Sequence, residues 1–101
     1  MNAELKSKWV EALRSGRYVQ GYGQLYYNQK YCCLGVLCSL MRPPDDPSEV
    51  EQSWDGWAGE LGPKMAEEAG LTVETQCHLV GMNDELRVPF ERIADYIEAN
   101  L

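Results

Sequence analysis

The chain has 101 residues, of which 45% are hydrophobic and 25% are charged, as in an average globular domain. This length predicts one domain with a single modest core, and the composition excludes intrinsic disorder and a collagen-like structure. Sixteen acidic and nine basic side chains give a formal charge of −7. Duplex nucleic acid is an unfavourable partner for such a surface, because binding it needs clustered Lys and Arg. The acidic excess favours solubility, or docking on a basic partner protein.

The N-terminal segment predicts an amphipathic helix over residues 2–15. Asn2 is a good N-cap, and Gly16 can adopt the left-handed conformation that ends a helix. The apolar stripe expected to face the core recurs at helical spacing and consists of Leu5, Trp9, Ala12 and Leu13.

Residues 17–33 change the pattern, since they hold five of the six tyrosines and no good helix-forming run. They predict two short strands, 24–27 and 30–33, joined as a β-hairpin by Asn28 and Gln29. Asn tolerates positive φ at the first turn position, whereas Gln is poorer than Gly at the second. Residues 34–41 are apolar on all sides and predict a central helix, although periodicity also allows a buried strand. Gly35 indicates close approach of another element.

Residues 42–53 are rich in proline and charge and predict an exposed connection that could form a contact surface. Trp54 and Trp57 follow, either closing one end of the core or forming a stacking platform. A short helix is expected over residues 63–69, stopped by Gly70.

Residues 72–82 predict a further helix, with Asn83 and Asp84 ending it and with a core stripe of Val73, Cys77 and Val80. The C-terminal helix begins near Pro89, and its apolar stripe consists of Phe90, Ile93, Ala94, Ile97 and Leu101. Together these segments predict a small α+β domain, residues 1–101, mostly helical, with one β-hairpin packed on a central apolar helix.

Two segments of the sequence resemble a family of short proteins encoded by bacteriophages and prophages. The N-terminal segment reads Trp9-x-x-Ala12-Leu13-x-Ser15-Gly16-x-Tyr18-x-Gln20-x-x-Gly23-x-Leu25, followed by Cys32-Cys33-Leu34-Gly35-Val36-Leu37-Cys38. The C-terminal one reads Met82-Asn83-Asp84 and then Ile93-Ala94-Asp95-Tyr96-Ile97-Glu98. The resemblance implies a phage accessory protein with a host-takeover or anti-defence role, and it supplies no catalytic residues. After Asn83-Asp84, where the family leads us to expect Gly or Ser, this chain has Glu85-Leu86-Arg87-Val88.

The cysteines do not form a pattern typical of disulfide scaffolds or of zinc sites. We expect reduced thiols that are mostly buried, and neither a metal nor another cofactor. An enzyme would need Cys32 or Cys33 to meet His78 and Asp84 in the fold, because adjacent Cys77 and His78 point apart on a helix. His78 itself is expected to be partly buried and hydrogen-bonded. A small thiol-dependent enzyme is therefore the alternative hypothesis, and no catalytic residue is assigned.

Binding is the favoured class of function, because aromatic side chains are concentrated in two short segments. The candidate ligand- or partner-binding residues are Arg17, Tyr18, Tyr22, Tyr26, Tyr27, Trp54 and Trp57. Cations near tyrosine rings, such as Lys30, suit a nucleotide-type small molecule, and the same surface suits a host protein. A homodimer or higher oligomer through the tyrosine face is a third possibility. No apolar run reaches the ~20 residues of a membrane span, and no signal peptide is evident, so we expect a protein of the host cytoplasm without membrane contact.

Overall fold

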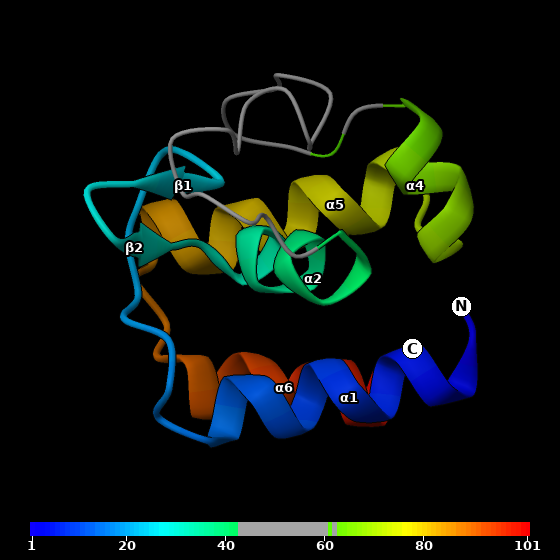
Figure 1. The fold of residues 1–101 in the computed structure, drawn as a ribbon, viewed down its shortest axis with the longest axis horizontal. Helices are drawn as coiled ribbons and strands as arrows, with labels where there is room; N and C mark the ends of the chain where they lie inside the picture. Colours follow the sequence, from blue (N-terminus) through cyan, green and yellow to red (C-terminus); the bar gives the residue numbers. More distant parts are fainter. Residues whose placement is uncertain (43–60, 62) are drawn as a thin grey trace.

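Two helices from opposite ends of the chain lie side by side in the computed structural model, which describes residues 1–42, 61 and 63–101 (Figure 1). They are α1 (Ala3–Arg14) and α6 (Phe90–Asn100), and they run in opposite directions. The Asn2 side chain caps α1 by accepting from the N–H groups of Glu4 and Leu5. Gly16 follows α1 with φ of +78°. Both predicted stripes are confirmed, with only Leu5 and Leu101 half-buried.

The central helix α2 (Cys33–Met41) settles the choice between helix and strand left open by the sequence. Every residue from Cys33 to Cys38 is buried, and α2 packs against α1 and against α5 (Val73–Val80). The expected strand over residues 30–33 is too long, because Cys32 is the N-cap of α2. Its Sγ accepts from the Gly35 N–H at 3.4 Å, so the chain has already turned into the helix there.

Gly35 lies directly on the backbone of Leu25. A Cβ added at Gly35 would stand 1.8 Å from the Leu25 carbonyl oxygen, so any side chain at this position would collide with main-chain atoms. The close approach expected from the sequence is therefore confirmed, and it brings the tyrosine-rich segment against α2.

The hairpin consists of β1 (Tyr26–Tyr27) and β2 (Lys30–Tyr31), paired antiparallel with Tyr26 opposite Tyr31. Its turn residues Asn28 and Gln29 have φ of +50° and +65°, the left-handed values that a two-residue hairpin turn requires. The segment that precedes the hairpin pairs with the edge of β2 that faces away from β1, since the Tyr31 N–H donates to the Val19 carbonyl at 2.8 Å.

The helix expected over residues 72–82 is longer than predicted and faces the core differently. Helix α5 continues without a break into a π-helical turn, η2 (Gly81–Glu85), so Asn83 and Asp84 do not end it. The predicted stripe is also wrong, because Val73 and Cys77 are exposed whereas Gln76, Leu79 and Asn83 are buried. Two polar side chains thus occupy core positions, and each is hydrogen-bonded there, as buried polar groups must be.

Helix α4 (Pro63–Ala69) has the predicted bounds, and Gly70 follows it with φ of +74°. The protein is thus a small α+β domain, mostly helical, with one hairpin packed beside a central apolar helix (Figure 1). Among the residues described, no helix is both long enough and apolar enough to cross a membrane.

Candidate functional site

The tyrosines of the hairpin region fall into a packed group and an exposed group. Tyr31 lies edge-on to Tyr18 and Tyr26, with ring centroids 5.0 and 4.9 Å away. All three are half-buried against the core, and the Tyr18 hydroxyl lies 3.3 Å from Oγ of Ser39 in α2. Burial, followed by the charges of the two neighbouring phenols, raises the pKa of Tyr31. Tyr18 and Tyr26, both candidate binding residues, therefore hold the hairpin on α2.

The exposed group borders a small pocket of ≈ 220 Å³, called here the tyrosine pocket, which is lined by Gly21, Tyr22, Gln24, Tyr27 and Lys30. Tyr22 and Tyr27 are 44% and 67% exposed. Tyr27 and Lys30 are opposite each other in the hairpin register, and both residues line the pocket. The sequence places Lys30 near the tyrosines, but only the structure shows that it lines the pocket.

Gly21 allows the segment before the hairpin to lie close to β2. A Cβ at Gly21 would stand 2.7 Å from Cβ of Lys30. The Gly21 N–H donates to the Tyr31 carbonyl at 2.7 Å, which fixes the segment at that distance. Gly21, one of the residues that line the tyrosine pocket, is therefore held in place by a backbone hydrogen bond.

Arg87 is a contact that the sequence analysis did not identify. Its guanidinium carbon lies 4.7 Å from the centroid of the Tyr22 ring, within the range of a cation–π interaction. Arg87 also has φ of +50°, in the left-handed region. The one available signal was that Glu85-Leu86-Arg87-Val88 departs from the family pattern.

Of the remaining candidate residues, only Arg17 is described, and it is not among the described residues that line the tyrosine pocket. Arg17 is exposed, and both its backbone N–H and its Nε donate to Oγ of Ser15, at 3.2 and 3.3 Å. Trp54 and Trp57 lie outside the described residues, as does most of the predicted 42–53 connection.

Asn83 joins three segments in the core behind the tyrosine pocket. Its Nδ2 donates to the Gly21 carbonyl (2.9 Å) and to Asp84 Oδ1 (2.7 Å). Its Oδ1 accepts from the Cys33 N–H (3.3 Å) and from Gln20 Nε2 (3.0 Å). The side chain is completely buried, and these bonds use both of its donors and its acceptor oxygen. Asn83 therefore links Gly21 of the tyrosine pocket to the start of α2.

Three of the four thiols are poorly placed to act as nucleophiles. Cys32, Cys33 and Cys38 are buried, whereas Cys77 is exposed. Burial raises the pKa of Cys32 to about 12 and that of Cys33 well above its usual value, which disfavours the reactive thiolate. His78 is exposed and stacks on Tyr96 at 4.8 Å between ring centroids, so the expectation that it is partly buried is wrong.

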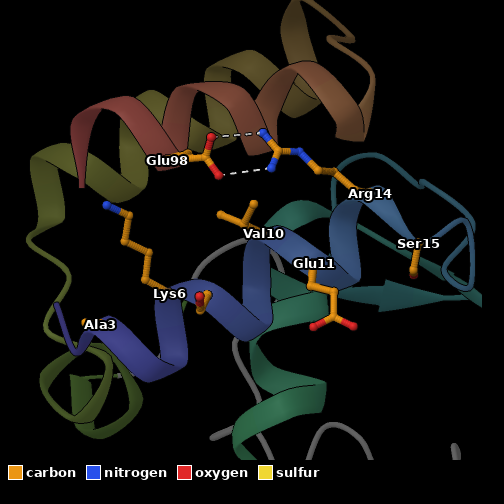
Figure 2. Close-up of a pocket in the computed structure, with 8 residues that line it drawn as sticks. Ala3, Lys6, Val10, Glu11, Arg14, Ser15 and Glu98 are labelled. Atoms are coloured by element: carbon orange, nitrogen blue, oxygen red, sulfur yellow. Dashed lines mark hydrogen bonds and ion pairs between the residues drawn. The ribbon is translucent and has the colours of Figure 1, made fainter.

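A larger groove of ≈ 710 Å³ runs along α1 beside α6 (Figure 2) and is lined by Ala3, Lys6, Ser7, Val10, Glu11, Arg14, Ser15 and Glu98. None of the described residues that line this groove is aromatic. Its arginine is already paired, since Arg14 contacts Glu98 at 3.0 Å and Asp95 at 2.7 Å, and these hydrogen bonds raise the pKa of the guanidinium. Among the described residues, Lys6 of this groove and Lys30 of the tyrosine pocket both lack an ion pair, so the two exposed rings make the tyrosine pocket the better candidate site.

The family comparison covers the segment that forms the tyrosine pocket. The model of a domain of unknown function, DUF8296, matches residues 1–71. Searches of curated proteins and of solved structures gave no match. The matched range contains α1, the hairpin and α2, whereas Asn83 and Arg87 lie beyond it. Because the match spans well over half of the 101 residues, the chain belongs to the DUF8296 family.

Proposed function

We propose that this protein is a non-enzymatic binding protein that holds a partner protein at the tyrosine pocket. The observation that carries the proposal is the pair of exposed rings, Tyr22 and Tyr27, that line one pocket together with Lys30. Tyrosine is enriched at protein interfaces because it presents a rigid apolar ring and a polar hydroxyl.

The size of the pocket favours a protein partner over a free small molecule. Pockets for small ligands usually measure about 300–1,000 Å³, and this one holds ≈ 220 Å³. A volume of this size suits a single anchoring side chain, and a few such anchors dominate the binding energy of protein interfaces. Flanking contacts on the exposed rings would supply the rest.

The surroundings of Cys32 and Cys33 support a function without covalent chemistry at these thiols. A nucleophilic thiol requires a lowered pKa and access to substrate. Cys32 and Cys33 are buried, and their pKa values are raised by that burial. The Cys33 Sγ lies 3.7 Å from the Leu79 carbonyl oxygen, its hydrogen-bond acceptor.

The resemblance to phage and prophage proteins supports a setting in the cytoplasm of a bacterial host. There the partner would be a host protein, and the effect would be inhibition of a defence component. This part of the proposal rests on the family resemblance.

Two single-residue variants test the binding surface. Tyr27→Ala removes an exposed side chain at the pocket, and Val73→Ala removes one of similar exposure (71%) on α5. A protein captured from a bacterial host lysate should be retained by Val73→Ala and lost with Tyr27→Ala. Equal capture by the unchanged protein and both variants would contradict binding at the tyrosine pocket.

A nucleotide-type ligand is the second candidate, because Lys30 lines the same pocket as tyrosine rings that could stack on a base. A thermal-shift screen with cyclic and ADP-ribose-type nucleotides separates the two. Stabilisation that depends on Lys30 would favour the nucleotide, and its absence would favour the protein partner. Sedimentation at two protein concentrations tests the third possibility, in which the tyrosine face binds a second copy of the chain.

A further inference from the structure

We propose that Arg87 is a second binding residue of this site, and that the partner presents an acidic segment with an apolar or aromatic anchor to it. This inference rests on the proposed function. The anchor enters the tyrosine pocket, and carboxylates beside it contact Arg87 and Lys30. Tyr22 links the two parts, since it lines the pocket and also lies under the Arg87 guanidinium.

The backbone of Arg87 is the first argument. Residues other than glycine rarely adopt positive φ, and such conformations persist where function or the surrounding structure requires them. Asn28 and Gln29 have positive φ because of the hairpin turn, and Arg87 has it because it follows Leu86, the C-cap of η2, where the Val88 N–H donates back to the Met82 carbonyl at 2.9 Å. This helix end also holds the Arg87 guanidinium over Tyr22. Arginine bonds carboxylates in a bidentate way and stacks on rings, which suits this position.

The distribution of charge is the second argument. Six of the sixteen acidic residues and none of the nine basic residues fall within residues 43–60, so the described residues carry a formal charge of only −1. None of the described residues that line the tyrosine pocket is acidic. Among the described residues Lys8, Arg14 and Arg42 form ion pairs, and Lys30 and Arg87 are two of the six cations that form none. Of these six, Lys30 lines the pocket and Arg87 contacts its Tyr22, so carboxylates of a partner bound there would meet both.

The test uses a synthetic probe, an eight-residue peptide with one phenylalanine flanked by glutamates, and its counterpart with glutamines. Binding to the ¹⁵N-labelled protein is followed by NMR through the backbone amide signals of Gly21, Tyr22 and Lys30. The acidic peptide should shift these signals, and the neutral peptide should bind about fivefold more weakly, as expected for exposed charge pairs.

Variants of Arg87 separate binding from backbone support. Arg87→Gly removes the cation and suits positive φ, so affinity should fall about fivefold while the thermal midpoint stays equal or rises. Arg87→Lys keeps the charge but loses the bidentate geometry and the stacking on Tyr22, so its affinity should lie between those of the unchanged protein and Arg87→Gly. Arg92→Ala removes an exposed arginine of α6 outside the pocket and should leave affinity unchanged.

The outcomes that overturn the inference differ from those that overturn the proposed function. Unchanged affinity in Arg87→Gly would exclude Arg87 as a binding residue, and equal binding of the two peptides would exclude an acidic partner. Either result would leave the tyrosine pocket as a binding site. If neither peptide moves the signals of Gly21, Tyr22 and Lys30, both the inference and binding of proteins at this pocket are wrong.

Discussion

Replacing Gly35 with alanine tests the closest contact in the core. A Cβ at this position in α2 would lie 1.8 Å from the carbonyl oxygen and 2.8 Å from the carbonyl carbon of Leu25. Both are main-chain atoms, so no side-chain rotation can relieve the collision. Helix α2 and the segment around Leu25 must separate by more than about 1 Å in an interior that is otherwise close-packed.

The expected loss in the free energy of unfolding follows from the contacts that this separation disrupts. Overpacking a core costs about 1–3 kcal/mol. Loss of the hydrogen bond from the Cys32 N–H to the Leu25 carbonyl (3.3 Å) adds about 1 kcal/mol. The better helix propensity of alanine offsets about 1 kcal/mol. Because the collision is with backbone, we expect Gly35→Ala to lower the free energy of unfolding by about 2–3 kcal/mol, a large share of the 5–15 kcal/mol usual for a domain.

Urea denaturation followed by circular dichroism measures this change, and Gly81→Ala is the matched control. Gly81 has helical φ of −59°, and a Cβ there would meet nothing within 4 Å. The same substitution should therefore stabilise the protein at Gly81, by about 0.5–1 kcal/mol. A Gly35→Ala variant as stable as the unchanged protein would refute the close approach of α2 to Leu25.

Three further predictions concern the turn and the thiols. Gln29→Gly should raise the free energy of unfolding by about 1 kcal/mol, because glycine adopts φ of +65° without strain; a loss of stability in urea would contradict the turn geometry. When the folded protein is treated with iodoacetamide, intact mass should show one label, at Cys77, because Cys32, Cys33 and Cys38 are buried. Additional labels on the folded protein would show that the core thiols are accessible. The pKa of Cys32 is raised from 9.0 to about 12 in the folded state. The contribution of this thiol to the free energy of unfolding is therefore fully present below pH 9. As the pH rises toward 12, the protein loses up to about 1.4 kcal/mol of stability per pH unit. Urea titrations across this range should show a shallower decline for Cys32→Ala, and an identical decline in both proteins would exclude this thiol as the source.

Helices α1 and α6 could be predicted from the sequence, with their ends, because the residues that indicate them lie close together in the chain. The apolar stripes of α1 and α6 repeat at helical spacing, and Asn2 and Gly16 act within a few residues of α1. The hairpin turn was likewise predictable, because φ at Asn28 and Gln29 is determined by a two-residue loop. Gly35 signalled a close neighbour but could not identify it as Leu25, which lies ten residues earlier.

The sequence thus determined the α+β class, the helices at both ends, the turn and the apolar central segment, because each depends on contacts a few residues apart. Only the tertiary structure decided that Asn83 is a core residue, since its partners Gly21 and Cys33 are distant in the chain. It also decided which tyrosines are packed and which are exposed, and it brought Arg87 onto Tyr22 across 65 positions of sequence. Burial and long-range hydrogen bonding are properties of the assembled core, and no local pattern of residues encodes them.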